Sequence, residues 1–389
     1  MSSECCSEEV VALTGELVRI PSENPTGTEK EIGEYVFQWL ARAGLETWKE
    51  PVAGERFNVI ARLPGTSKDA PALAWLAHLD TVPAGEGWTR DPFGAEIVDG
   101  RLYGRGSADM KGGLAAAMVA LKQLASEGFR PVGDLLLIAT VDEEGPDMIG
   151  AMDVYKKGMV RRDSYLVAVE PSDLKILAGH KGPLWYRLEV KGKMAHAGMP
   201  WHGVDAIHGM SACLLRLKEL VQSLPYDDEL LGPATVNIGR IQGGVKTNIV
   251  PAFCYAEVDL RATYPMTVEE ADALIARALQ EGVAQVPGAT AGWQRLGLKR
   301  PPQKIPAGSP LLQSFQSAAQ AVLGRAETAG FPAYTDAAII ASLVGSPHCL
   351  TFGPGNLSQA HAVDEYVEVE QLPLAARVLA QAARLLLSP

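Results

Sequence analysis

The sequence predicts an α/β fold with two domains: a mixed, mostly parallel sheet and an inserted α+β layer. The length of 389 residues favours two domains over one. Apolar runs at 135–141 and 165–169 are typical of strands buried on both faces. A helical segment at 111–126 separates a strand near 72–79 from the run at 135–141, and this alternation favours a partly parallel sheet.

The first domain is expected to begin with a helix at 8–20. Thr28 and Glu31 form a capping-box pattern that should start a second helix, which ends at Gly44. The remaining predicted elements are strands near 57–63, 72–79, 134–141 and 164–169, and helices at 310–324 and 370–387.

The pattern changes near residue 180, where half-exposed strands replace the buried ones. The predicted order is strand 184–191, helix 203–222, strands 235–241 and 254–261, helix 268–283 capped by Thr267 and Glu270, and strand 290–297. This β-α-β-β-α-β order is typical of a compact ferredoxin-like insert. We therefore expect a first domain made of 1–179 and 299–389, interrupted by a second at 180–298.

The composition excludes several classes of partner. A formal net charge of −11 disfavours nucleic acid and anionic membranes, which both reward clustered Lys and Arg. The amino-terminal stretch has neither the basic nor the apolar part of a signal peptide, and no apolar run is long enough to span a bilayer. Five cysteines without CxxC spacing do not suggest a disulfide framework. A cytoplasmic protein is expected.

Candidate metal ligands follow the predicted strands. Ligand sites in open parallel sheets lie at the carboxyl ends of the strands, where several of these side chains should meet. Histidines and carboxylates without cysteine suit a pair of divalent, zinc-like ions. The candidates are His78, Asp80, Asp109, Glu143, Glu144, Glu170 and His361.

Each candidate also has an ordinary structural interpretation. His78 with Asp80 is equally typical of a core histidine paired with an acid, and Asp109 of a helix cap. In the functional interpretation, Asp80 accepts the second ring proton of His78, while Asp109 bridges two ions roughly 3.5–4 Å apart. Glu143 and Glu144 repel each other and favour cations, so that one acid could bind metal while its neighbour handles protons.

Other hydrolase and nucleotide-binding signatures are missing from the sequence. There is no His-Glu-x-x-His, no Gly-x-Ser-x-Gly and no Walker loop, and the glycines at 104–106 lack dinucleotide-loop spacing. A single-zinc protease of that type, an α/β-hydrolase, a P-loop enzyme and a dehydrogenase therefore lack support.

Four motifs, in this order, resemble a known family over nearly the whole chain. They are His78-x-Asp80-Thr-Val-Pro, Gly104-Arg-Gly-x-x-Asp109-Met-Lys-Gly-Gly, Asp142-Glu143-Glu144-Gly and Glu170-Pro-Ser. The chain resembles the zinc-dependent aminoacylases, deacetylases and carboxypeptidases of the M20 type, including acetylornithine deacetylase, succinyl-diaminopimelate desuccinylase and carboxypeptidase G. Ala77 departs from the glycine often found before the first histidine.

The resemblance implies a role for each candidate. Asp109 would bridge two metals, with His78 and Glu170 on one and Glu144 and His361 on the other. Glu143 would be the general base, and Asp80 would support His78. The metals would be zinc foremost, with cobalt or manganese as alternatives.

The resemblance also makes the insert a lid and dimerisation domain. His196 would reach the partner subunit's active site in a homodimer and help to hold the oxyanion. Asn248 and Arg261 would contact polar groups of the substrate, and Arg261 with the Gly353–Gly355 loop would bind its α-carboxylate. His180, His202, His208 and His348 receive no ligand role.

The expected reaction is hydrolysis of the amide bond in an N-acyl amino acid. A dipeptidase or carboxypeptidase with the same chemistry is an alternative, as is a succinyl-diaminopimelate desuccinylase. The segment that begins at His180 resembles the deacetylase branch more than the desuccinylases. A catalytically silent scaffold on this fold is the non-enzymatic alternative, which the intact ligand set and Glu143 argue against.

Overall fold

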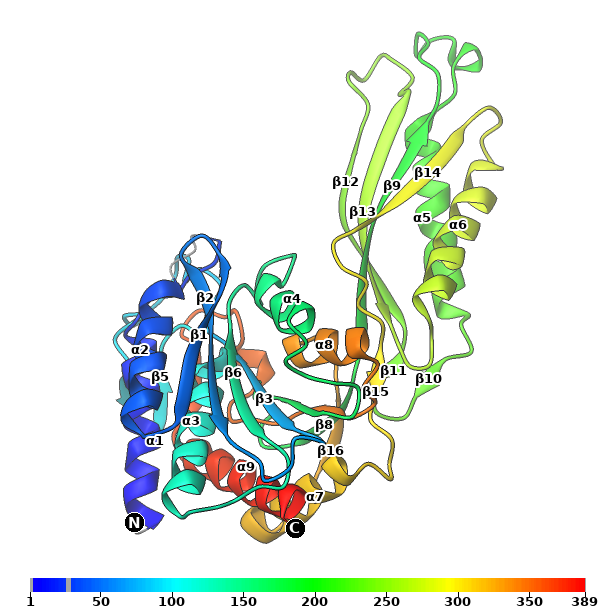
Figure 1. Cartoon of the computed structure of the whole chain (residues 1–389). Coiled ribbons are helices and arrows are strands. Elements are labelled where there is room, and N and C mark those ends of the chain that lie inside the picture. Colours follow the sequence, from blue (N-terminus) through cyan, green and yellow to red (C-terminus); the bar gives the residue numbers. More distant parts are fainter. Residues whose placement is uncertain (1–2, 26–28, 389) are drawn as a thin grey trace. The chain divides into compact units, whose positions relative to one another are not determined.

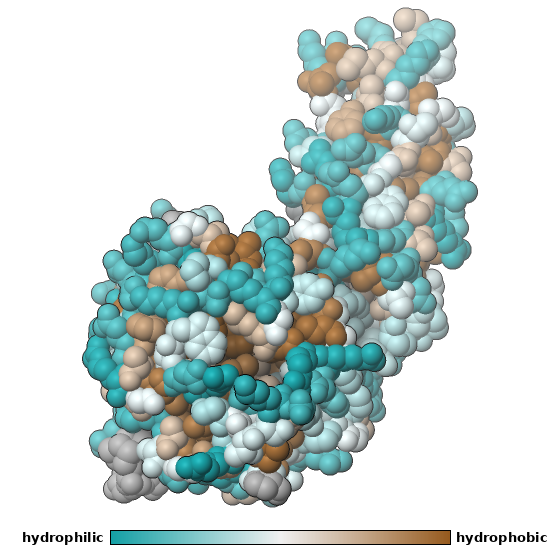
Figure 2. Space-filling view, in the orientation of Figure 1, coloured by the Kyte–Doolittle hydropathy of each residue, from teal (hydrophilic) through white to brown (hydrophobic). Residues whose placement is uncertain are grey.

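The computed structural model describes residues 3–25 and 29–388, which divide into two compact units (Figure 1). Unit 1 comprises Met1–Gly179, Lys304–Phe331 and Thr335–Pro389. Unit 2 comprises His180–Gln303 with Pro332–Tyr334. Unit 2 is therefore an insertion in the chain of unit 1. Figure 2 shows hydrophilic side chains over much of the visible face of each unit, with apolar residues in small groups between them.

A nine-stranded sheet forms the centre of unit 1, in the order β1-β2-β6-β3-β7-β17-β8-β15, with β16 paired to β8. The four central strands, β6, β3, β7 and β17, run parallel, so their carboxyl ends share one edge. The strands are β1 (Glu46–Ala53), β2 (Arg56–Leu63), β3 (Leu73–His78), β6 (Leu135–Thr140), β7 (Tyr165–Ala168), β8 (Ile176–His180), β15 (Gln303–Lys304), β16 (Thr328–Phe331) and β17 (Cys349–Thr351).

Helices cover the sheet of unit 1. Helices α3 and α8 both pack on β3; α1, α9 and α7 extend the layer of α3, and α4 lies beside α8. The helices are α1 (Ser3–Val18), α2 (Glu29–Arg42), α3 (Gly112–Ser126), α4 (Ile149–Lys156), α7 (Pro310–Leu323), α8 (Asp336–Val344) and α9 (Gln371–Leu387). Two short turns of helix, η1 (Ser107–Lys111) and η3 (Leu357–Gln359), and a small sheet of β4 (Glu96–Val98), β5 (Arg101–Tyr103) and β18 (Tyr366–Glu368) complete the unit.

The core explains why the central strands form. Every residue of β3 and β6 is buried, as expected for parallel strands with helices on both faces. Helix α3 is buried along most of its length, because it lies between the sheet and its neighbouring helices. The apolar runs that predicted these elements are the runs that fill the core.

Unit 2 is a four-stranded antiparallel sheet in the order β12-β13-β9-β14, with α5 and α6 packed on it and on each other. Its elements are β9 (Gly182–Lys191), η2 (Pro200–His202), α5 (Ala206–Gln222), β10 (Asp227–Asp228), β11 (Gly232–Pro233), β12 (Thr235–Gly243), β13 (Phe253–Ala262), α6 (Val268–Val283) and β14 (Thr290–Leu296). The capping box of Thr267 and Glu270 is present as predicted. The predicted β-α-β-β-α-β order is present, with the short strands β10 and β11, which were not predicted, between α5 and β12.

The predicted mixed α/β fold class is confirmed, although some elements were not foreseen. Neither β1 nor α8 was predicted, and the predicted cap at Thr28 lies outside the described residues. In the described part of the chain, no helix combines the length and the apolar character needed to cross a bilayer.

Candidate metal centre

The ends of three neighbouring parallel strands bring most of the candidate ligands together. His78 is the last residue of β3, Glu143 and Glu144 follow β6, and Glu170 follows β7. Because β6, β3 and β7 are adjacent and parallel, these side chains emerge at the same edge of the sheet. Asp109 reaches this edge from the η1 turn.

His78, Asp109 and Glu170 form the first group of potential ligand atoms. The Nε2 atom of His78 lies 3.0 Å from Asp109 Oδ1 and 3.7 Å from Glu170 Oε1. All three ligand atoms lie within 4.8 Å of one another. The side chains are 1% (His78), 12% (Asp109) and 7% (Glu170) exposed, so a cation here would be shielded from solvent.

Asp109, Glu144 and His361 form a second group that shares Asp109 with the first. The Nε2 atom of His361 lies 3.0 Å from Glu144 Oε1 and 3.5 Å from Asp109 Oδ2. The two oxygens of Asp109 therefore face two different histidines, Oδ1 toward His78 and Oδ2 toward His361. A carboxylate in this position can bridge two cations.

Glu143 belongs to a third group with His78 and Glu144, again with ligand atoms within 4.8 Å. Its carboxylate has no hydrogen bond or ion pair with any of the residues that the structure describes, unlike the carboxylates of Glu144 and Glu170. A carboxylate beside a ligand cluster but not engaged by it is free to exchange a proton.

The backbone of Asp80, rather than its carboxylate, orients the ring of His78. His78 Nδ1 lies 2.8 Å from the carbonyl oxygen of Asp80 and 3.8 Å from its Oδ1 atom. This contact requires the proton on Nδ1, so Nε2, which faces Asp109, is the atom that can bind a cation in place of a proton. The expected carboxylate contact is thus replaced by a carbonyl contact from the same residue.

The carboxylate of Asp80 instead holds the turn after β6. Its Oδ1 accepts from the backbone N–H of Glu143 and its Oδ2 from that of Glu144, both at 3.1 Å. Asp80 therefore fixes the backbone of the two adjacent acids.

Glu365 fixes the turn that carries Asp109, and sequence reasoning missed it. Its buried carboxylate accepts backbone N–H bonds from Gly106, Ala108 and Asp109, each at 3.0 Å, and pairs with Arg105 at 2.6 Å. Some 256 residues separate Glu365 from Asp109, and no local pattern marks it. An acid that satisfies three backbone donors pre-organises the turn before any ligand binds.

Charge repulsion and burial perturb the acids of the centre. Burial raises the pKa of Glu170 and Glu143 well above the usual range, and raises that of Glu144 less strongly; neighbouring carboxylates add to the effect. Burial opposes protonation of His78, yet the carboxylates around it, Glu170 foremost, raise its pKa well above its usual value. The hydrogen bond to Glu144 raises the pKa of His361. Only the pKa of Asp109 falls, because His78 and His361 outweigh its burial.

This donor set fits two divalent cations. Imidazole nitrogens and carboxylate oxygens in two adjoining groups match the ligands that zinc, cobalt and manganese accept in proteins. So many acids cannot all be ionised in a buried space without cations between them. The residues present therefore agree with the predicted pair of metals.

The loop of Gly353 and Gly355 follows β17 at the same edge. A Cβ atom on Gly353 would lie 2.6 Å from the carbonyl oxygen of Glu170, so only glycine allows this close approach. The backbone N–H groups of Gly353 and Gly355 already donate to Ser172 Oγ (3.0 Å) and Gln371 Oε1 (2.8 Å). A substrate carboxylate could use either amide only by displacing these acceptors, so the loop is better suited to supporting Glu170.

The predicted residues His196, Asn248 and Arg261 all belong to unit 2. The backbone N–H of Ala197 donates to the carbonyl of Asn248 at 3.1 Å, which places the His196 loop beside Asn248. On β13, Arg261 donates through Nε and Nη2 to Asp259 Oδ2, at 3.1 and 2.9 Å. Its guanidinium is therefore held at two points.

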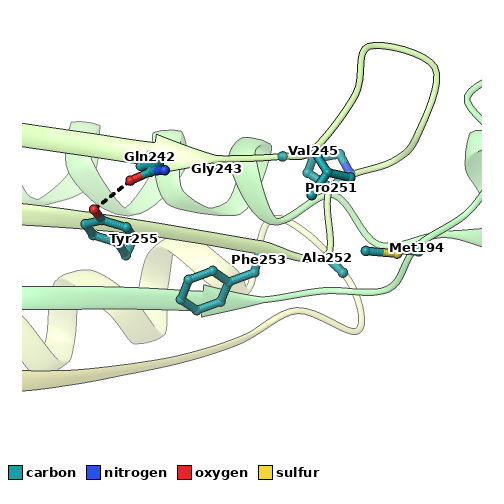
Figure 3. A pocket seen from close by; sticks show the side chains of 9 residues that line it. Met194, Gln242, Gly243, Val245, Pro251, Ala252, Phe253 and Tyr255 are labelled. Atoms are coloured by element: carbon teal, nitrogen blue, oxygen red, sulfur yellow. Dashed lines mark hydrogen bonds between the residues drawn. The ribbon is translucent and has the colours of Figure 1, made fainter.

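A cavity of about 210 Å³ also lies in unit 2, at the end of the sheet (Figure 3). It is lined mainly by apolar side chains, including Met194, Val245 and Phe253, and a Tyr255–Gln242 hydrogen bond of 2.8 Å closes one side. None of the candidate metal ligands lines it.

Comparison with known proteins agrees with this centre. The model of peptidase family M20/M25/M40 matches residues 74–385. An acetylornithine deacetylase of Edwardsiella ictaluri is 33% identical over 343 residues, which is 85% of this chain and 84% of the relative. The fold matches a tripeptidase from Staphylococcus aureus (TM-score 0.80, 23% identity, 98% of both chains). It also matches the Bacillus subtilis protein YXEP, a dinuclear metal binding peptidase (TM-score 0.75, 20% identity, 99% of both chains). The chain belongs to peptidase family M20/M25/M40 and is a hydrolase.

Proposed function

We propose that this enzyme hydrolyses the amide bond of an N-acyl amino acid. The observation that carries the proposal is the pair of ligand groups that share Asp109, with the unengaged carboxylate of Glu143 beside them. The deacetylase relative, at 33% identity, supports an acyl group on the amine of an amino acid as the substrate class.

In this proposal one cation is held by His78, Asp109 and Glu170, and a second by Asp109, Glu144 and His361. Zinc is the first choice, with cobalt or manganese as alternatives. When bound, such a pair lowers the pKa of a water and polarises an acyl carbonyl.

Glu143 is the proposed general base. Its carboxylate takes a proton from the attacking water and later delivers it to the nitrogen of the leaving amine. The hydrogen bonds that Asp80 accepts from the backbone N–H groups of Glu143 and Glu144 fix the turn from which the proposed base and the proposed ligand project.

Unit 2 is the proposed lid and dimerisation domain. Arg261, held by Asp259, would bind the α-carboxylate of the substrate, and Asn248 another of its polar groups. His196 would donate to the oxyanion in the partner subunit of a homodimer.

The exposed apolar side chains Trp201 (73%) and Val245 (71%) support a contact between copies through unit 2. Light scattering coupled to gel filtration should give twice the mass of one chain, 41.5 kDa; a monomer at micromolar concentration would contradict the dimer.

A peptidase of the same family is the second candidate, because the matching family model and the tripeptidase neighbour both concern peptide bonds. The deciding experiment compares N-acetyl amino acids, N-succinyl amino acids and di- and tripeptides on zinc-loaded and cobalt-loaded protein. Highest kcat/KM on an N-acetyl amino acid supports the deacetylase. Highest kcat/KM on peptides would replace it with the peptidase, and no turnover of any substrate would favour the silent scaffold.

A further inference from the structure

We propose that Asn24, in the loop between α1 and α2, is a positioning residue for Glu143 and acts through the carboxylates of Asp80 and Asp142. The inference rests on the proposed role of Glu143 as general base. Asn24 does not belong to any of the ligand groups.

The side-chain amide of Asn24 lies between two carboxylates. Its Nδ2 atom donates to Asp80 Oδ2 at 2.8 Å and to Asp142 Oδ1 at 2.9 Å. Because an amide nitrogen has two protons, these bonds use its whole donor capacity. Asn24 is only 8% exposed, so solvent gives little help in separating the two charges.

The backbone fixes Asn24 to the chain that follows β3. Its N–H donates to the carbonyl of Thr81 at 2.8 Å, and the N–H of Thr81 donates to the carbonyl of Ser22 at 2.9 Å. The loop and the strand end are therefore paired over two hydrogen bonds. This pairing fixes the backbone from which the amide reaches Asp80.

Both acceptors of Asn24 shape the turn that carries Glu143. Asp80 binds the backbone N–H groups of Glu143 and Glu144. Asp142 precedes Glu143, has a left-handed backbone (φ 67°), and accepts from Ile149 N at 3.3 Å and Arg56 Nη2 at 3.1 Å. Asn24 thus links the carboxylate of Asp80, which binds the backbone of the turn, to the carboxylate of Asp142, the residue that begins the turn.

Removing the amide would leave Asp80 and Asp142 facing each other across a buried gap. Like charges at that separation repel, and the repulsion would act on the turn, because Asp142 begins it and Asp80 binds its backbone. Displacement of the Glu143 backbone would misplace its carboxylate, and small misplacements of a catalytic group cost rate more than binding. The metal ligands His78, Asp109 and Glu170 lie outside this turn, whereas the ligand Glu144 lies on it and would shift with Glu143.

The test compares Asn24→Ala with Asn24→Asp, which keeps the shape but, when ionised, replaces the donor with a third negative charge. The matched control is Ser346→Ala. Ser346 is also buried in unit 1, and it makes two hydrogen bonds, to Ser164 O (2.9 Å) and from His348 N (3.2 Å), before β17 begins. The control removes the same number of bonds at the opposite end of the parallel strands.

The readouts are amide hydrogen exchange of the peptide that contains Glu143 and Glu144, cobalt stoichiometry, and kcat and KM on the best N-acetyl amino acid. Both Asn24 variants should exchange faster in this peptide and reach the wild-type cobalt stoichiometry at saturating cobalt, although the ion of the Glu144 group should bind more weakly. At saturating cobalt they should lose about 10- to 100-fold in kcat with KM little changed. Asn24→Asp should lose more than Asn24→Ala. Ser346→Ala should be destabilised without these changes.

Unchanged exchange in that peptide, or a kcat loss no larger than that of Ser346→Ala, would overturn the role of Asn24. If the wild-type enzyme turns over no substrate, the proposed function has failed, and the exchange measurement still decides whether Asn24 holds the turn.

Discussion

Glu143 and Glu144 are adjacent in sequence, yet their side chains have different environments. Glu144 contacts His361, whereas Glu143 has no polar partner in the described part of the chain. The turn contributes to this difference, because Asp80 binds both backbone amides and so fixes the backbone from which the two side chains project. Because both residues are glutamates, their residue type alone could not have assigned them different roles.

Replacing Glu143 with alanine should abolish turnover and leave metal binding intact, because the proposed base is not a ligand in either group that shares Asp109. We expect a loss of at least about 100-fold in kcat. Elemental analysis of the metal content and a measurement of kcat on the same sample check both expectations. Glu144→Ala is the comparison and should lose metal as well as activity. A Glu143→Ala enzyme that retains most of its activity would remove Glu143 from its role.

The buried carboxyl group of Asp336 should make the stability of the protein depend on pH. It is 3% exposed, bonds Thr140 near the end of β6, and burial raises its pKa from 3.8 to about 7. A raised carboxyl pKa means that the folded state binds the proton more tightly, so Asp336 lowers stability progressively as pH rises from about 4 to about 7. Above that range the full penalty remains.

Asp336→Asn removes this titration while keeping the shape. Relative to wild type, the variant's free energy of unfolding should increase by about 3 kcal/mol between about pH 5 and about pH 8. Urea unfolding of metal-free protein at the two pH values measures it. The exposed Asp147→Asn is the control and should show no such trend. A pH-independent difference for Asp336→Asn would show that Asp336 is ionised throughout.

At the scale of elements, α3 can approach the end of β7 only because residue 113 is glycine. A Cβ there would lie 1.8 Å from the carbonyl oxygen of Val169, next to the ligand Glu170. Gly113→Ala should cost about 3 kcal/mol or more in stability and weaken cobalt binding, since helix and strand must separate. Urea unfolding and cobalt titration test this against Gly308→Ala, whose Cβ meets open space. Equal behaviour of the two variants would contradict the tight contact.

The elements that the sequence predicted are those with a strong local signal. The apolar runs of β3, β6 and β7 and the cap of α6 each lie within one segment, and they placed the predicted ligands at strand ends. The edge strand β1 was missed because it carries charged residues and is only partly buried. Glu365 and Asn24 were missed because their partners are distant in the sequence, and hydrogen bonds across such distances leave no periodic pattern. The positive φ of His361 (63°), unusual for a side chain other than glycine, is likewise visible only in the fold.

For the whole molecule, metal and stability should be linked. Zinc added to chelator-treated protein should raise the free energy of unfolding, by roughly 2.7 kcal/mol at a hundredfold excess over Kd, and should release protons because the ligands must be deprotonated. Calorimetry in buffers of different ionisation enthalpy measures the protons. Hydrogen exchange should slow in the ligand-bearing segments of unit 1. Magnesium, which prefers oxygen ligands, is the control ion. Zinc that neither stabilises unit 1 nor releases protons would contradict the metal centre.

The connection between the units has a consequence for synthesis of the protein. Strands β8 and β15, on either side of the insertion, are neighbours in one sheet. Within unit 2, Gly182 lies against Arg300, so the folded insertion holds its own ends together and shortens the loop that unit 1 must close. His361 and Glu365 belong to the segment made after the insertion. A growing chain on the ribosome therefore lacks His361 and Glu365 until the insertion has been made, and the proposed centre cannot be complete before then.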